Sequence, residues 1–231
     1  MIRGVGTAIN VVTVVTGTAI GVGLGHRIPA KVREVPLHGV GLLTLVLGAR
    51  SFSATHNAVF PVVAIIVGGA IGALLDIESR LQRLGERLHE RFARDDDVGF
   101  VQGFVDSSLL FCVGPMTILG SLQDGIHGQV ELLAIKGALD GLVAIVYATS
   151  SGIGVGFSAL VVAVVQGTIT LFGAMAGDSF LTPRMVVELE AAGGVMIVGI
   201  GLRVLDLKHI PVASLLPALV IAPVLVALFA V

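Results

Sequence analysis

Residues 4–25 read GVGTAINVVTVVTGTAIGVGLG, twenty-two consecutive positions without an Asp, Glu, Lys or Arg. A helix that crosses a bilayer needs about 20 mostly apolar residues. This stretch is therefore long enough and apolar enough to span a membrane. It also resembles the apolar part of a signal peptide, but the rest of the chain is just as hydrophobic, and we interpret it as a retained transmembrane helix.

The composition extends that interpretation to the whole chain. Of 231 residues, 55% are apolar, 13% are charged and 31 are Gly, and the mean hydropathy is +1.00. A soluble domain has roughly 25% charged residues and about 7% Gly. The single cysteine, Cys112, excludes a disulfide framework, and the net charge of -2 gives no basis for binding nucleic acid. We predict an all-α, polytopic membrane helix bundle that is embedded in the lipid bilayer.

The apolar runs predict eight spans. The second run is short, and the fifth contains Lys136 and Asp140, so seven spans plus a re-entrant segment is the alternative. The predicted spans cover residues 4–25, 37–52, 57–76, 101–120, 131–149, 152–176, 185–204 and 211–230.

Lys and Arg predict the orientation, because cytoplasmic loops carry an excess of both. With the N-terminus outside, ten of them fall on the inside and three on the outside, which favours both termini outside. The inside group is Arg27, Lys31, Arg33, Arg80, Arg83, Arg87, Arg91, Arg94, Arg203 and Lys208; the outside group is Arg3, Arg50 and Arg184.

A repeat relates the two ends of the chain. Residues 11–18, VVTVVTGT, match residues 161–168, VVAVVQGT, at six of eight positions. Two further correspondences follow in the same order: Gly41, Gly48 and Arg50 have the spacing of Gly194, Gly201 and Arg203, and Pro61 corresponds to Pro217. We predict two three-helix repeats, residues 1–77 and 151–231, inverted in the membrane as in many secondary transporters. Two central helices, residues 100–150, lie between them.

The segment between the third and fourth spans, residues 78–99, is the most polar part of the chain. Ile77, Leu81, Leu84, Leu88 and Phe92 recur at helical spacing and predict an amphipathic connector helix over residues 77–94 at the cytoplasmic membrane surface. The acidic run at residues 95–97 is expected to end it. The alternative interpretation is a helix that binds a regulatory partner.

Charged residues inside the predicted spans indicate a functional site. A central Asp or Lys costs about 2.5–3.5 kcal/mol on insertion scales, so it is rare without a partner or a cavity. Asp140 lies near the middle of the fifth span, with Lys136 one turn away, and Asp106 lies in the fourth span. We predict that both carboxylates surround a site for a cation or a proton, with Lys136 as the counter-charge. The alternative is a self-neutralised Lys136–Asp140 pair that only holds helices together.

Uncharged groups complete the candidate site. Asn10, Gln102 and Gln166 supply hydrogen-bonding side chains within predicted spans. Gly114 and Pro115 interrupt the fourth span, where Pro removes a backbone hydrogen bond and frees carbonyls that a ligand can use. The sequence contains no nucleotide-binding motif, no metal-ligand spacing and no nucleophile with a base. We therefore expect neither a catalytic residue, a metal nor a cofactor.

The central motifs resemble those of the domain-of-unknown-function 554 family of bacterial inner-membrane proteins. The resemblance lies in residues 103–120, GFVDSSLLFCVGPMTILG, in Asp124-Gly125, in residues 136–141, KGALDG, and in shorter blocks at Gly152, Gln166 and Leu215. It covers nearly the whole chain. It implies a multi-helix fold in the bacterial cytoplasmic (inner) membrane, and it includes Asp106, Lys136 and Asp140 in matched blocks.

These observations predict a secondary transporter, or a carrier subunit, for a small ion or solute, coupled to a cation or proton through Asp140 and Asp106. The second hypothesis is a non-transporting sensor or scaffold that acts through the helix at residues 77–94. Glycine-lined helix faces would permit a homodimer.

Overall fold

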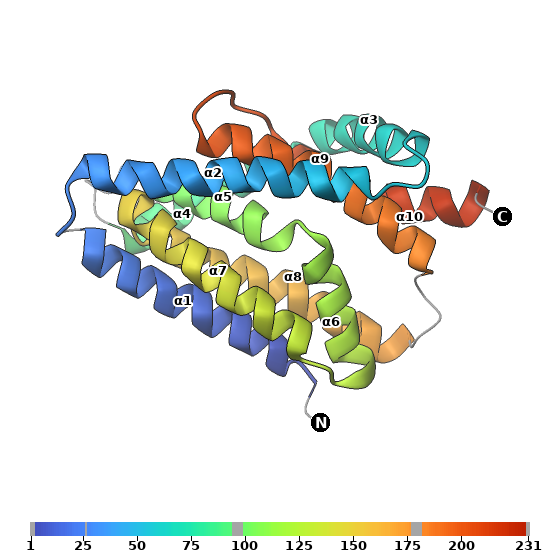
Figure 1. Ribbon diagram of the computed structural model, residues 1–231, viewed down its shortest axis with the longest axis horizontal. Helices are drawn as coiled ribbons and strands as arrows, with labels where there is room; N and C mark the ends of the chain where they lie inside the picture. Colours follow the sequence, from blue (N-terminus) through green and yellow to red (C-terminus); the bar gives the residue numbers. More distant parts are fainter. Residues whose placement is uncertain (1–2, 26, 94–98, 177–181, 230–231) are drawn as a thin grey trace. The chain divides into compact units, whose positions relative to one another are not determined.

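The computed structural model describes residues 3–25, 27–93, 99–176 and 182–229, and within them it contains helices and no strand. The prediction of an all-α helix bundle is confirmed (Figure 1). The helices are α1 (Val5–Gly25), α2 (Ala30–Ser53), α3 (Val59–Leu74), α4 (Ile77–Phe92), α5 (Phe100–Cys112), α6 (Pro115–His127), α7 (Glu131–Ser151), α8 (Gly154–Ala176), α9 (Pro183–Val204) and α10 (Ala218–Phe229), with a short 3-10 helix, η1 (Val212–Leu215), before α10.

Six helical stretches are long and apolar enough to cross a membrane, and two bent pairs raise the number to eight if each pair makes one span. The bent pairs are α3 with α4, at 54°, and α5 with α6, at 60°. The chain is therefore a multi-pass membrane protein. The predicted fourth span is two helices, because the backbone turns at Gly114 with a φ of +151° and α6 begins at Pro115.

Several helix boundaries follow from single residues. The predicted second span was too short: α2 begins at Ala30, a full two turns before residue 37, with Pro36 inside it. The α3 helix ends before Asp76, which adopts a left-handed φ of 52°. In the last predicted span, η1 ends at Leu215 and α10 begins just after Pro217.

The chain folds into two compact units. The first comprises Met1–Val40, Gln82–Cys112 and Met116–Asp178, and the second comprises Gly41–Leu81, Val113–Pro115 and Ser179–Val231. Each unit thus draws on both of the segments predicted to be repeats. The duplication itself stays a prediction.

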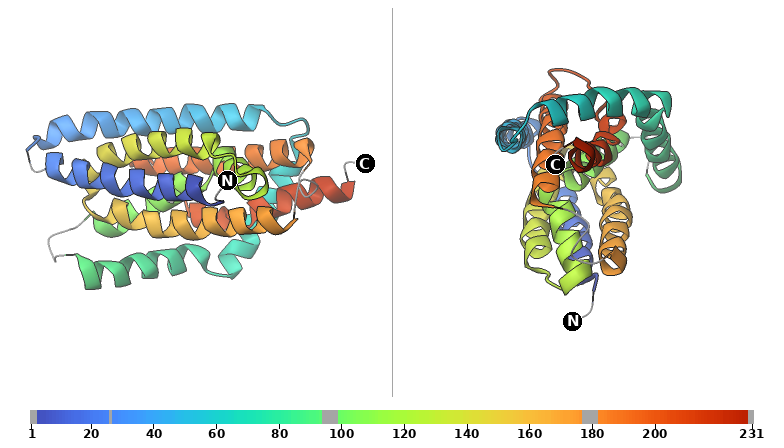
Figure 2. Two further views of the ribbon diagram at one scale, coloured as in Figure 1. Left: turned by 90° about the horizontal axis from the view of Figure 1, so that it is seen from below. Right: turned by 90° about the vertical axis from the view of Figure 1, so that its right-hand side faces the viewer.

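In the first unit, α1 and α7 run parallel and pack backbone against backbone, as Figures 1 and 2 show. A Cβ atom on Gly17 would lie 2.3 Å from the Gly141 carbonyl oxygen, and one on Gly21 would lie 2.3 Å from the Ile145 oxygen. Gly25 continues the contact at Thr149. Small residues permit such close approach in lipid, where the hydrophobic effect does not hold helices together.

The α8 helix runs antiparallel to α1, because the chain reverses at Gly152 after α7 (Figure 2). Gly156 of α8 packs against Thr18 of α1. The α5 helix packs against α8. The α6 helix approaches the C-terminal half of α8, where Gly125 contacts the Thr170 backbone. Five helices therefore enclose the interior of the first unit.

In the second unit, α2 packs against α9 and α3 against α10, both pairs antiparallel. Gly48 meets Gly194, while Gly41 meets Gly201 and the Leu205 side chain. In the other pair Gly68 packs on Ala218, and Gly72 on Ser214. A small core of buried alanines joins α3, α9 and α10: Ala64, Ala192, Ala218 and Ala222.

The predicted amphipathic helix corresponds to α4, which ends at Phe92. Within the first unit its buried Gly85 contacts Phe104 of α5, and its His89 and Phe92 rings pack on Phe100 and Phe157. Part of its apolar face is therefore used inside the chain. Arg94 and the acidic run at residues 95–97 lie outside the described residues.

Alanine substitutions in α1 test the close packing of α1 on α7. Gly21→Ala places a methyl group on the Ile145 carbonyl, and we expect a loss of about 1–3 kcal/mol in unfolding free energy. Gly23→Ala, two residues away, meets nothing within 4 Å and should be neutral or slightly stabilising. Thermal unfolding of both variants in detergent gives the comparison. Equal unfolding temperatures would contradict the backbone contact.

Candidate functional site

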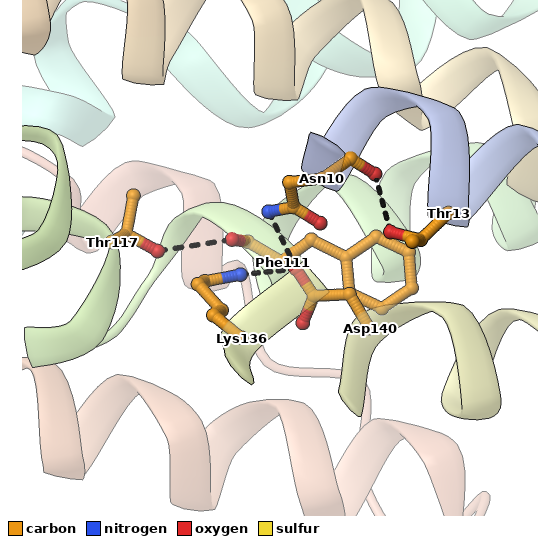
Figure 3. Close-up of polar contacts among 6 residues, drawn as sticks. All are labelled: Asn10, Thr13, Phe111, Thr117, Lys136 and Asp140. Carbon is orange, nitrogen blue, oxygen red and sulfur yellow. Dashed lines mark hydrogen bonds and ion pairs between the residues drawn. The ribbon is translucent and has the colours of Figure 1, made fainter. Parts of the chain in front are cut away.

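Three polar side chains meet inside the first unit, between α1 and α7. The Asp140 carboxylate accepts a short hydrogen bond from the Lys136 ammonium and a second, of 3.0 Å, from the Asn10 amide nitrogen. All three residues are buried, Lys136 being 6% and Asp140 9% exposed. Figure 3 shows the ammonium and the amide converging on the carboxylate. The predicted pairing of Lys136 with Asp140 is therefore present, and Asn10 joins it.

Glycine brings Asn10 to this position. A Cβ atom on Gly137 would lie 3.1 Å from the Asn10 Cα atom, so a larger residue would push α7 and α1 apart at this level. Thr13 hydrogen-bonds the Asn10 carbonyl at 2.8 Å (Figure 3). Since the backbones are this close, the short Asn10 side chain reaches Asp140.

The end of α5 lies near the same charges. The α5 helix packs against α7 and ends at the buried Cys112. Immediately before it, the Phe111 carbonyl, freed where α5 ends, accepts a hydrogen bond of 3.1 Å from the Thr117 hydroxyl of α6 (Figure 3). A broken helix thus contributes backbone polar groups to this interior, which is tolerated in a membrane only inside the protein.

The other predicted residues divide into two groups. Asp106 on α5 and Gln166 on α8 are buried in the first unit, at 1% and 0% exposure. Gln102 is exposed on α5 and does not join the buried groups, because it lies on another face of the helix. Gly114 and Pro115 belong to the second unit, where the space beside Gly114 is bounded by Ile197.

Sequence reasoning missed two buried carboxylates. Asp124 of α6 accepts hydrogen bonds of 3.0 Å from the Gly4 and Gly6 amides and so caps the N-terminus of α1. Glu188 of α9 is 2% exposed and accepts hydrogen bonds from three groups of the α2–α3 loop. Those donors are the Thr55 hydroxyl at 2.5 Å and the His56 and Asn57 amides at 2.9 and 3.2 Å.

Arg203 corrects the orientation argument. The orientation prediction counts Arg203 as a cytoplasmic loop residue. The side chain lies in the last turn of α9, is 8% exposed and pairs with Glu78 at 2.5 Å. It also donates to the Ile210 carbonyl at 3.1 Å, while Glu78 accepts from the Ala213 amide at 2.8 Å. This cluster fixes the turn between α9 and α10, so Arg203 is a structural charge.

The buried charged pair of the first unit is Lys136 with Asp140. Among the residues that the structure describes, no group of three or more His, Cys, Asp or Glu side chains is placed to hold a metal ion. The Lys136–Asp140 pair is neutral overall when both are ionised. A cation or a proton that reaches Asp140 competes with the ammonium for the same carboxylate.

Together the helices and these enclosed charges define a multi-pass α-helical membrane protein with a polar interior. Residues 5–227 match the model of the family described as "Protein of unknown function (DUF554)", and the chain belongs to that family. The resemblance predicted from the central motifs is confirmed.

Two relatives match over nearly their full length. The uncharacterized membrane protein YdfK of Bacillus subtilis (strain 168) is 29% identical over 225 residues, which cover 96% of this chain and 95% of that protein. The uncharacterized protein YqgA of Escherichia coli (strain K12) is 29% identical over 225 residues, 94% of each chain. No solved structure matches the chain.

Substitutions at the ion pair test its energetic role. Lys136→Met leaves the Asp140 carboxylate buried without its ammonium, and breaking a buried pair in this way costs about 3–5 kcal/mol. The double variant Lys136→Met/Asp140→Leu removes both charges and should recover most of that loss. Unfolding temperatures in detergent measure both effects, with Glu131→Gln, an exposed carboxylate on the same helix, as the control. A double variant no more stable than Lys136→Met would contradict the pairing.

Proposed function

We propose that this protein is a secondary transporter, or a carrier subunit, for a small ion or solute in the bacterial cytoplasmic membrane. The observation that carries the proposal is the buried cluster of Lys136, Asp140 and Asn10. Ionisable residues within membrane spans are costly and are usually found along substrate or ion pathways. Lys136 and Asp140 are both charged residues inside α7, enclosed by apolar helices.

The helix pairing supports an inverted repeat. The predicted equivalents are α1 with α8, α2 with α9 and α3 with α10, and each helix packs on its own equivalent. In all three pairs the two helices run antiparallel, as two copies of opposite orientation require. Gly48 and Gly201 occupy matching repeat positions, as do Gly41 and Gly194, and the contacts Gly48–Gly194 and Gly41–Gly201 exchange under that correspondence. Inverted repeats give a carrier two related arrangements, each open to one side.

Asp140 is the proposed coupling residue, with Asp106 as a second carboxylate. Lys136 acts as an internal cation that holds Asp140 when no external cation or proton is bound. When Asp140 takes up a proton, it no longer holds the ammonium, and the contact between Lys136, Asp140 and Asn10 rearranges. That change in a contact between α1 and α7 links binding to helix movement.

The scaffold hypothesis has less support. The apolar face of α4 is partly used within the chain, because Phe92 packs on Phe157 of α8 and the neighbouring Gly85 and His89 pack on α5. Leu84 and Phe92 of that face are 43% and 54% exposed. The charged face of α4 stays exposed. A scaffold would lose its partner when α4 is altered, while a carrier would keep at least partial flux.

Flux in proteoliposomes tests the coupling role. With an imposed pH gradient and Na⁺ or K⁺ on one side, the wild-type protein should accelerate proton movement over that in protein-free vesicles. We expect Asp140→Asn to reduce the protein-dependent rate at least about tenfold, because the neutral amide can neither bind a proton nor release the Lys136 ammonium. Glu131→Gln should leave the rate unchanged. An Asp140→Asn rate equal to that of the wild type would exclude Asp140 as the coupling residue.

A further inference from the structure

Gln166 of α8 has an unusual environment for a glutamine. Its side chain is 0% exposed, and neither its amide oxygen nor its amide nitrogen has a hydrogen-bond partner among the described residues. A buried amide without partners is costly, and most buried polar groups in proteins are paired. Packing alone does not account for a glutamine at this position, since a Leu of similar size would avoid the cost.

Other buried polar atoms of α1 and α8 also have no hydrogen-bond partner among the described residues. The Asn10 amide oxygen has no partner in the described part of the chain, although its nitrogen is used by Asp140. The hydroxyls of Thr7 and Thr170 are likewise buried and unpaired there. Thr170 lies one turn after Gln166 on the same face of α8.

The packing of α1 on α8 brings these groups to one level of the bundle. The two helices are antiparallel and Thr18 contacts Gly156. Counting back along α1 and forward along α8 by equal steps from that contact places Thr7 at about the level of Gly167, the residue after Gln166. Asn10 lies one turn further along α1, at its contact with Asp140.

Gln166 and Asn10 are 0% exposed, so a ligand reaches these atoms only when the surrounding helices move apart. Their hydrogen-bonding capacity then limits which ligand fits. A metal cation would use only the amide oxygens and leave the Gln166 nitrogen unpaired, whereas an anion would use only the donors. A ligand with both donors and acceptors satisfies both ends of the amide. Lys136 and Asp140 neutralise each other. The Asp124 carboxylate, which lies beside Thr7 and Thr170 in the fold, already accepts hydrogen bonds from the Gly4 and Gly6 amides. The position therefore favours an uncharged molecule.

We propose that Gln166 and the Asn10 oxygen, with the Thr7 and Thr170 hydroxyls, form the solute-binding position of the carrier. Its solute is a small uncharged molecule with hydrogen-bond donors and acceptors, of the carboxamide or polyol class. This inference rests on the proposed transport function and names the substrate class for it. Asn10 then touches both the solute and Asp140, and so connects solute binding to the coupling residue.

Solute entry into proteoliposomes tests the proposal, with acetamide, glycerol and erythritol as neutral probes and potassium chloride as the charged probe. Stopped-flow light scattering should show at least one neutral probe entering faster than in protein-free vesicles. Gln166→Leu should lower that protein-dependent rate at least about tenfold, the effect of losing roughly one buried hydrogen bond. The matched control is Gln102→Leu, at an exposed glutamine, which should keep the wild-type rate.

Thermal unfolding supplies a second readout, which separates binding from structural support. Gln166→Leu removes an unpaired buried amide, so the variant should unfold at the wild-type temperature or above. A solute that stabilises the wild-type protein should no longer stabilise this variant. A lower unfolding temperature for Gln166→Leu would show a structural role and overturn the proposal.

Three flux results would also overturn the proposal. No neutral probe enters faster than in protein-free vesicles, the entry rate with Gln166→Leu equals that of the wild type, or the protein accelerates the entry of water but of no solute. If a proton or ion flux sensitive to Asp140→Asn persists in the first case, only the solute class is wrong. If no probe and no ion moves, the transport function fails as well. A neutral flux that depends on Gln166 but not on Asp140 would support the solute site and exclude the coupling role.

Discussion

The contact between α1 and α7 determines most of what the first unit can do. Glycines on both helices remove the side chains that would hold the backbones apart, and at Gly17 a single added carbon would overlap the Gly141 carbonyl. In water such a contact would be one of many that bury apolar area. In lipid, apolar area drives no association, so close packing and hydrogen bonds between helices must supply the attraction. The same closeness lets Asn10 reach Asp140, which means that the packing of the helices and the geometry of the polar cluster have one cause.

The polar side chains of the first unit differ in how many of their hydrogen-bonding atoms have partners. Lys136 pairs with Asp140, and the Asn10 nitrogen also donates to Asp140 while its oxygen has no partner among the described residues. Neither end of the Gln166 amide has a partner among those residues. A membrane protein with purely structural polar contacts would satisfy all of them, because each open group is costly in a medium without water. The proposed carrier requires both kinds of group. Lys136 supplies a permanent counter-charge, and the unpaired atoms of Asn10 and Gln166 supply a position for an exchangeable molecule.

The sequence predicted the features that depend on short-range pattern. The lengths of the hydrophobic runs predicted the membrane-spanning helices. Gly114 and Pro115 predicted the break before α6, and the spacing of Lys136 and Asp140 predicted their pairing. It failed where partners are far apart in the chain. Glu188 caps a loop more than 130 positions away, and Arg203 pairs with Glu78 at a similar separation. Nothing local distinguishes such residues from interfacial charges. Gln102 differs for another reason: most of α5 is buried, and the sequence did not show that residue 102 lies on its exposed side.

The parallel direction of α1 and α7 restricts how the chain is threaded through the bilayer. Two spanning helices that point the same way must be separated by an odd number of crossings. The α2 helix makes one of these, so the bent pairs α3–α4 and α5–α6 either both cross or both turn back. If each of the six long helices crosses once, the total is then eight or six, within the range of six to eight that the described helices allow. An even total would place the start of α1 and the end of α10 in the same compartment, where tags fused next to either helix would report identical accessibility.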